Sequence, residues 1–262
     1  MPTMWTCEHL ETIDSTQREA LRRLQHGSPP GATALDAHGD SPFVIWTLQQ
    51  TQGVGRHGRR WQDSPQGGLA MTLAWPQADD DTQAWSSLPA RLSLVVLHAL
   101  ERCHPVLAHR LGLKWPNDIV AEDAKLAGVL AARHRVQGRY WWLAGVGMNV
   151  YWDRPPALDR PVTDLRALGA ADVDPQAVVH AVCSDVERMS RGELFAEQWE
   201  QEFMKRDTFA GCAVVVVDPS TGAALYEGTH QGICPSGELL LAGPQAVQRI
   251  GLGELSLRRA PL

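Results

Sequence analysis

A loop between two apolar, strand-like runs constrains the fold of this chain most strongly. The runs span 43–48 and 69–75, and the loop 50–61 between them carries three glycines and three arginines. Glycine lets a backbone approach a ligand closely, and arginine offers a planar charged group to carboxylate or phosphate oxygens. Trp61, at the end of the loop, adds a flat face that can cover a ring. The pattern predicts an anion-binding loop between two strands, with a solvated basic loop as the alternative.

The loop matches neither of the two common phosphate-binding motifs. No Gly-Lys-Ser/Thr follows the glycines, and no helix-like pattern opens after them. The formal net charge of the chain is −6, so its surface as a whole does not attract nucleic acid. Local arginines on an acidic background favour a small anionic ligand over a polyanion. The length of 262 residues allows one large domain, or one domain with a small satellite.

The cysteine pattern predicts a cytoplasmic protein. Five cysteines are widely separated, without the spacing of metal ligands and without a preceding secretory segment. Reduced thiols are therefore expected, and no metal site is expected. No apolar run approaches the roughly 18 residues that a membrane span requires.

A helix is expected on the N-terminal side of the strand-like run 43–48. Thr16 and Glu19 have the spacing of a capping box, and apolar residues follow at helical spacing until Gly27. The pattern predicts about three turns that begin near Ser15. The N–H groups of its first turn would suit an oxygen-rich ligand, although most such motifs only cap the helix.

The second informative stretch lies at 113–130. A Trp-Pro-Asn-Asp turn at 115–118 separates two extended runs. Lys125 stands at the entry of the next apolar strand, in which Gly128 leaves room for a ligand or a neighbouring backbone. Lys125 is a candidate functional residue, since it lies between this strand and the turn that carries Asp118; the alternative is a solvated strand end, which is usual for a lysine that flanks a strand.

A further strand is expected at 139–150. Gly145 and Gly147 recur with period two, so one face of the sheet is bare at this point. The bare face fits either a flat ring that lies on the sheet or a closely packed helix. Asn149 at the end of the strand could hydrogen-bond such a ring.

Two helices are expected at about 175–191 and 193–206, and the composition changes near Asp207. Five short strand-like runs follow, at 212–217, 223–229, 238–241, 246–250 and 255–257. They predict a small SH3-like barrel. The predicted fold is thus α+β: a catalytic domain at 1–207, with a mixed β-sheet packed with helices, and an SH3-like domain at 208–262.

Taken in order, five motifs resemble those of bacterial biotin protein ligases. They are Asp-Ser-Thr at 14–16, the Gly/Arg loop at 50–61, Lys-Trp-Pro-Asn-Asp at 114–118, Lys-Leu-Ala-Gly at 125–128 and Gly-Val-Gly-Met-Asn-Val at 145–150. The segment 228–258 resembles the C-terminal barrel of that family, so the resemblance covers essentially the whole chain.

The resemblance implies an ATP-dependent ligase. Such an enzyme activates biotin as biotinyl-5′-AMP and transfers it to a lysine of a biotin carboxyl carrier protein. Mg²⁺ would arrive with ATP and be held by the phosphates. Because the chain begins directly with the catalytic region, a monofunctional type without a DNA-binding domain is expected, as a monomer or a homodimer.

The resemblance also implies which residues form the site. The biotin-binding residues would be Ser15, Thr16, Gln17, Gln50, Gly53, Gly55, Arg56, Lys125 and Gly128. The residues that bind ATP or the adenylate would be Arg56, Arg59, Trp61, Lys125 and Asn149. Arg56, Lys125 and Asp118 would be catalytic. Val54, His57 and Gln17 depart from the arginine, arginine and asparagine that the family usually has.

Three other functions fit the sequence less well. A lipoate or octanoate ligase shares a related fold, but the Gly/Arg loop and the barrel argue against it. A non-catalytic biotin-binding protein would need neither Arg56 nor Lys125. A nucleic-acid-binding module is disfavoured by the net charge and by the lack of aromatic residues interleaved with the basic ones.

Overall fold

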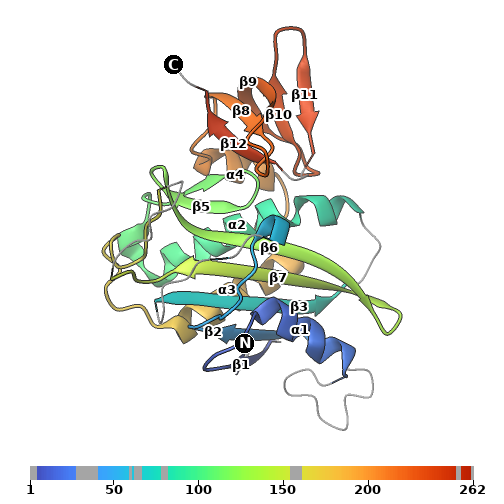
Figure 1. Ribbon diagram of the computed structural model, residues 1–262, viewed down its shortest axis with the longest axis vertical. Coiled ribbons are helices and arrows are strands. Elements are labelled where there is room, and N and C mark those ends of the chain that lie inside the picture. The colour runs from blue at the N-terminus through green and yellow to red at the C-terminus, as the bar shows by residue number, and fades with distance from the viewer. Residues whose placement is uncertain are drawn as a thin grey trace.

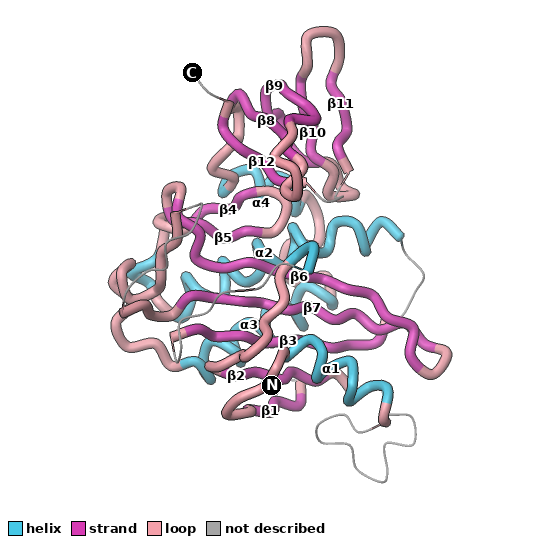
Figure 2. The backbone as a smooth tube through the Cα atoms, in the orientation of Figure 1, coloured by secondary structure: helices cyan, strands magenta, loops and turns pink. Residues whose placement is uncertain are grey.

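Two β-sheets of unequal size organise the molecule. The computed structural model describes residues 5–27, 41–58, 61, 67–77, 82–153, 161–251 and 255–260. Figure 1 shows the larger sheet with its helices and, at one end of it, the smaller C-terminal sheet. Figure 2 shows that strands dominate both parts. The α+β class predicted from the sequence is confirmed.

The larger sheet has seven strands in the order β1-β2-β3-β7-β6-β5-β4. Their bounds are β1 Thr6–His9, β2 Phe43–Thr47, β3 Gly68–Pro76, β4 Gly112–Lys114, β5 Asp118–Ala121, β6 Ala124–Val136 and β7 Arg139–Asn149. The pair β1–β2 is parallel and the other pairs are antiparallel, so the sheet is mixed. The strands expected on either side of the Gly/Arg loop are β2 and β3.

The helices cover the two faces of this sheet unequally. They are α1 Thr16–Gln25, α2 Thr82–Cys103, α3 Pro175–Ser190 and α4 Trp199–Arg206, with short 3₁₀ turns η1 Arg56–Gly58 and η2 Pro105–Leu107. Alternation along β2 shows the division: Val44 joins the core beneath α2 and α3, whereas Ile45 joins the smaller core beneath α1. In Figure 1, α2 and α3 lie behind the sheet and α1 lies in front. The part of this sheet face that α1 does not cover is available for a binding site.

Two helix starts differ from the predictions. Ser15, not Thr16, caps α1, because its side chain accepts a hydrogen bond from the N–H of Arg18. Glu19 does not close a capping box; it forms ion pairs with Arg22 and Arg23. The helix α4 begins at Trp199 rather than near 193, since three residues with positive φ, Gly192, Phe195 and Gln198, lie between the end of α3 at Ser190 and the start of α4.

The C-terminal sheet has five antiparallel strands in the order β11-β10-β9-β8-β12. They are β8 Ala213–Val217, β9 Ala224–Ile233, β10 Leu239–Ala242, β11 Val247–Ile250 and β12 Ser256–Arg259, close to the five predicted runs. The closure of these strands into a barrel and the domain boundary at 207 stay predictions.

Buried polar contacts attach this sheet to the larger one. His230 Nε2 lies 2.7 Å from Asp207 Oδ2, and both side chains are fully buried. The N–H of Gly232 donates to His230 Nδ1, so the proton of the neutral ring lies on Nε2 and points to Asp207. The indole N–H of Trp115 donates to the carbonyl of Gly237 at 2.9 Å. The small sheet is thereby held against the turn that carries Asp118.

Candidate functional site

A pocket lies on the sheet face that α1 leaves uncovered. Its floor is made of small or flat-lying residues on three adjacent strands, β3, β7 and β6. The register places them in two rows, Thr72–Gly145–Leu130 and Ala70–Gly147–Gly128. Three of the six are glycines, so the floor is bare in the region where β6 and β7 meet.

A flat ring lies on the glycine face, which is one of the two alternatives expected from the sequence. The ring belongs to the chain itself. A Cβ atom added at Gly147 would be 2.5 Å from Cε2 of Trp61, so the indole rests directly on this glycine. A Cβ added at Gly145 would be 3.0 Å from Oε1 of Gln17. The start of α1 and the end of the Gly/Arg loop are thus brought together over β7.

Buried hydroxyl and amide groups close one end of the pocket. The side-chain oxygen of Gln50 accepts hydrogen bonds from the N–H and the hydroxyl of Thr16, at 2.9 and 3.3 Å. The hydroxyl of Thr72 donates to that of Thr16 at 2.9 Å. Ser15, Thr16 and Thr72 are almost inaccessible to solvent. This end can hydrogen-bond a small polar ring that enters from the pocket.

An ion pair beside this end stabilises the start of α1. Asp14 accepts hydrogen bonds from both terminal nitrogens of Arg22 and from the N–H of Ser15. The Arg22 guanidinium lowers the pKa of Asp14 from its ordinary value of 3.8 to about 2. Because the folded-state pKa is depressed, the carboxylate stabilises the fold above pH 3.8 and loses that contribution as the pH falls towards 2.

Replacing Asp14 with asparagine is therefore expected to lower the thermal midpoint at pH 7 more than at pH 2.5. The expected loss at neutral pH is about 1 kcal/mol, since the side chains of this pair are partly exposed and water screens it. Thermal unfolding followed by circular dichroism at both pH values measures the difference. An equal loss at both pH values would show that the charge of Asp14 does not stabilise α1.

Cationic groups gather at the opposite end of the pocket. The ammonium group of Lys125 forms an ion pair with Oδ1 of Asp118, and both side chains are mostly buried. The same nitrogen lies 5.4 Å from the centre of the Trp61 ring. A Cβ added at Gly128 would lie 2.9 Å from Nζ of Lys125 and 3.2 Å from Oδ1 of Asp118. Gly128 leaves room, as expected, and the ion pair occupies it.

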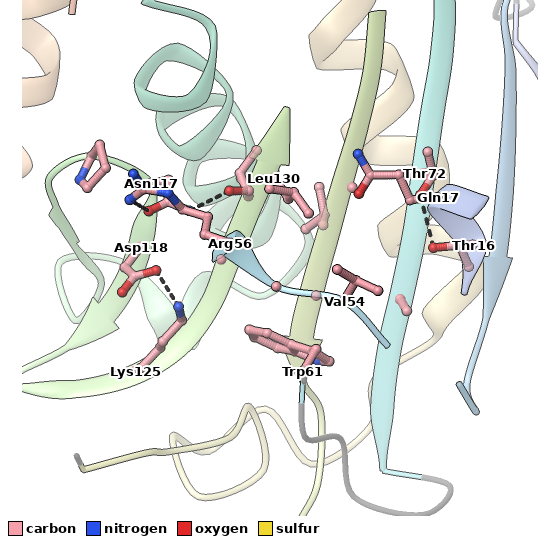
Figure 3. A pocket seen from close by; sticks show the side chains of 18 of the residues that line it. Thr16, Gln17, Val54, Arg56, Trp61, Thr72, Asn117, Asp118, Lys125 and Leu130 are labelled. Atoms are coloured by element: carbon pink, nitrogen blue, oxygen red, sulfur yellow. Dashed lines mark hydrogen bonds and ion pairs between the residues drawn. The ribbon is translucent and has the colours of Figure 1, made fainter. Parts of the chain in front are cut away.

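The second cation, Arg56, is held by a residue of the Trp-Pro-Asn-Asp turn to which the sequence analysis gave no role. One terminal nitrogen of Arg56 donates to Oδ1 of Asn117 and to the carbonyl of Leu255, both at 3.4 Å. The amide nitrogen of buried Asn117 donates to the carbonyl of Val129, which fixes which end of the amide faces Arg56. Figure 3 shows Arg56, Asn117, Lys125 and Asp118 across the pocket from Thr16, Gln17 and Thr72.

The C-terminal part of the chain also contributes to the pocket, through Pro219 after β8, Leu255 before β12 and Ser256 at the start of β12. Leu255 and Ser256 lie in the segment that resembles the C-terminal barrel of the family, but only the folded chain shows that they and Pro219 line the pocket. The motif Trp-Pro-Asn-Asp did offer a signal for Asn117, since a polar residue next to a predicted catalytic carboxylate is a candidate for the same site.

Most of the site residues predicted from the sequence line this one pocket. They are Ser15, Thr16, Gln17, Gln50, Gly55, Arg56, Trp61, Asp118, Lys125 and Gly128, and Val54 joins them. Gly53 and Asn149 are not among the described residues that line it. Gly53 packs between the side chain of Gln50 and Trp61. Arg59 and the side chain of His57 lie outside the described residues.

Asn149 supports the backbone of the site instead of facing the pocket. Its amide nitrogen donates to the carbonyls of Lys125, at 3.3 Å, and Thr163, at 3.0 Å, and the residue is buried. It thereby ties the start of β6 to the end of β7. A contact between Asn149 and adenine stays a prediction.

The described part of the chain has neither a cluster of metal-ligating side chains nor a membrane-spanning helix. No three or more His, Cys, Asp and Glu side chains are grouped as a metal site would require. None of its helices is both long and apolar enough to cross a membrane.

Comparison with known proteins identifies the family. The model of the Biotin/lipoate A/B protein ligase family matches residues 35–149. A *Mycobacterium tuberculosis* protein named biotin–[acetyl-CoA-carboxylase] ligase is 33% identical over 228 residues, which cover 87% of this chain and 79% of that protein. The chain belongs to the biotin protein ligase family. A *Paracoccus denitrificans* protein of the same name is 29% identical, over 94% of this chain and 98% of that protein.

Solved structures of biotin protein ligases share the fold. The enzyme from *Aquifex aeolicus* in complex with biotin and ATP superimposes with a TM-score of 0.74 at 24% identity, covering 97% of this chain and 99% of that one. The enzyme from *Leishmania major* in complex with biotinyl-5-AMP superimposes with a TM-score of 0.64 at 22% identity, covering 95% and 98%. Both sheets of the present chain therefore lie within the fold of biotin protein ligases.

Proposed function

We propose that this protein is an ATP-dependent ligase that converts biotin to biotinyl-5′-AMP and transfers the biotinyl group to a lysine of a biotin carboxyl carrier protein. One observation carries the proposal: Arg56 and Lys125 converge at one end of a pocket whose other end is closed by buried hydroxyl groups. A molecule with a polar ring at one end and a carboxylate at the other matches this arrangement.

Orientation of biotin follows from the two ends of the pocket. Its ureido ring offers two N–H donors and one carbonyl acceptor, which suits Ser15, Thr16 and Gln50 at the closed end. Gln17, above Gly145, stands beside the ring position. The aliphatic chain would lie along the bare floor, and its carboxylate would reach the Lys125 end.

The first chemical step needs cations because both reactants are anionic. A carboxylate oxygen of biotin attacks the α-phosphorus of ATP, the bond to the bridging oxygen breaks, and pyrophosphate leaves. Two unit charges 4 Å apart repel by about 4 kcal/mol at an effective dielectric constant of 20. Lys125 and Arg56 offset this repulsion and stabilise the charge that develops on the phosphoryl oxygens. Mg²⁺ bound to the phosphates would supply further positive charge, without a protein cage.

In this proposal, Trp61 binds the adenine ring. Its indole lies on Gly147 beside the Lys125 ammonium, so a base stacked on it would place the α-phosphate near that cation. Arg59 would help to hold the nucleotide. Asn149 would act through the backbone of Lys125 and, as predicted, could contact the adenine.

The second step transfers the biotinyl group to the carrier. The lysine amine of the carrier attacks the acyl carbon of the mixed anhydride, AMP leaves, and the amine loses a proton. Asp118 is the carboxylate among the described residues that line the pocket, and it can orient the amine or accept the proton. The ion pair with Lys125 holds Asp118 at the reacting end of the pocket.

Biotin-dependent exchange of labelled pyrophosphate into ATP tests the first step directly. Exchange with biotin, and its absence with octanoate or lipoate, is expected. Exchange with lipoate or octanoate alone would instead assign the protein to the related acyl ligases. Tight binding of biotin without exchange of any acid would indicate a binding protein and contradict the proposal. Addition of a carrier domain, followed by mass spectrometry, then tests the transfer.

A further inference from the structure

Lys114 is a lysine of the pocket to which no role has yet been given. The chain has only three lysines, Lys114, Lys125 and Lys205, and two of them line the same pocket. Lys114 ends β4 and pairs in register with Asp118 on β5. Asp118 is thus the register partner of one lysine of the pocket and the ion-pair partner of the other.

The strand order gives the pocket a direction. Thr72 lies on β3, Gly145 on β7, Lys125 on β6, Asp118 on β5 and Lys114 on β4. Neighbouring strands are about 4.8 Å apart, so the pocket extends over roughly 19 Å from β3 to β4. The polar ring end lies at β3 and the start of α1. Lys125 and Asp118 mark the reacting end, and Lys114 lies one strand beyond them.

The chemistry of adenylation has a direction as well. In a phosphoryl or nucleotidyl transfer the attacking and leaving oxygens lie roughly in line on opposite sides of the phosphorus. If the carboxylate arrives from the β3 side, the pyrophosphate departs towards β5 and β4. The leaving group carries most of the negative charge of ATP, so this side of the pocket requires cations.

The edge at β4 provides them. Nζ of Lys114 lies 5.1 Å from the centre of the Phe209 ring, and Cζ of Arg259 lies 4.8 Å from the same centre. Two cations therefore lie against one aromatic ring at the β4 edge, and of these two Lys114 lines the pocket. Two carboxylates lie near them: Asp118 forms its ion pair with Lys125, and Asp123 lies 3.6 Å from Arg259.

We propose that Lys114 binds the β- and γ-phosphates of ATP and the pyrophosphate that departs from it. The inference rests on the proposed adenylation and identifies the part of the pocket that holds the leaving group. Lysine suits this task, because its ammonium group acts as a compact point charge towards phosphate. The adenylate itself has lost both of these phosphates and does not extend to Lys114.

The last statement provides a selective test. Lys114→Met keeps the apolar stem beside Phe209 and removes the charge. In the exchange assay it is expected to raise the KM for pyrophosphate and for ATP by about tenfold, the effect of losing one charge-assisted hydrogen bond. The affinity for synthetic biotinyl-5′-AMP, measured by calorimetry, is expected to stay within about twofold of the wild type. Lys114→Arg should recover part of the pyrophosphate affinity.

A matched control is available in Lys205→Met, on the surface of α4, where Lys205 forms an exposed ion pair with Glu202. It is expected to behave as the wild type in both assays. Equal losses of affinity for pyrophosphate and for biotinyl-5′-AMP in Lys114→Met would overturn the proposal, since they would indicate a structural role beside Phe209. Unchanged KM values would overturn it as well. Absence of exchange in the wild type would refute the adenylation itself, and calorimetric titration of ATP into both proteins would still test Lys114.

Discussion

Lys125→Met is expected to reduce biotin-dependent ATP–pyrophosphate exchange by about 10²–10³-fold. The ammonium group lies at the reacting end of the pocket, is mostly buried, and faces both Asp118 and the Trp61 ring. Loss of a preorganised group that stabilises charge in the transition state has an effect of this size. Because the charge acts mainly as the phosphorus is attacked, the maximal rate should fall more than the affinity for biotin. Steady-state exchange and direct titration of biotin separate the two quantities.

The variant has a second consequence that must be controlled. Removal of Lys125 leaves the carboxylate of Asp118 mostly buried without its cation, and an uncompensated buried charge destabilises a fold. The double variant Lys125→Met/Asp118→Asn removes both charges and should recover much of any lost thermal stability. It should not recover exchange. Exchange within about tenfold of the wild type in the stable double variant would contradict the role of Lys125 in adenylation.

Gly147→Ala is expected to raise the KM for ATP by about 10- to 100-fold. The new Cβ would lie only 2.5 Å from the Trp61 ring, and ring atoms on both sides of that contact are within 2.9 Å. Neither the β7 backbone nor a ring can yield as a flexible side-chain end does, so Trp61 must leave its place on the sheet. Stacking of a base on an aromatic side chain contributes about 1–3 kcal/mol, which corresponds to the stated change.

Gly145→Ala is the matched control, two residues earlier on the same strand and the same face. Its Cβ would meet Oε1 of Gln17 at 3.0 Å, and the end of that flexible side chain can move aside. Gly145→Ala is expected to weaken biotin binding by a few fold and to leave the KM for ATP nearly unchanged. If Gly147→Ala and Gly145→Ala altered ATP and biotin binding to the same extent, Trp61 would not be the adenine contact.

The local elements of this protein follow from the sequence, since they depend on neighbouring residues. Apolar alternation and glycine-rich turns located β2, β3, β5, β6 and β7, and the five C-terminal runs, within a few residues. The proximity of Lys125 and Asp118 could also be expected from the sequence, because the two residues lie seven apart on adjacent strands of one hairpin. The two wrong predictions also concern local structure. Ser15, not Thr16, caps α1, and residues with positive φ precede α4, so that it begins later than expected.

The contacts that complete the site were decided by the tertiary structure alone. Arg56 donates hydrogen bonds to Asn117, which is 61 residues away in the sequence, and to the carbonyl of Leu255, which is 199 residues away. The floor exists because the register of three strands aligns Gly128 with Gly147, and the bare face is filled by Trp61 from a distant loop. Periodicity tells which face of a strand is apolar, but register and close packing decide what lies against that face. The sequence by itself thus determined the elements and the chemistry of the loop, and the fold determined which distant groups hold that chemistry in place.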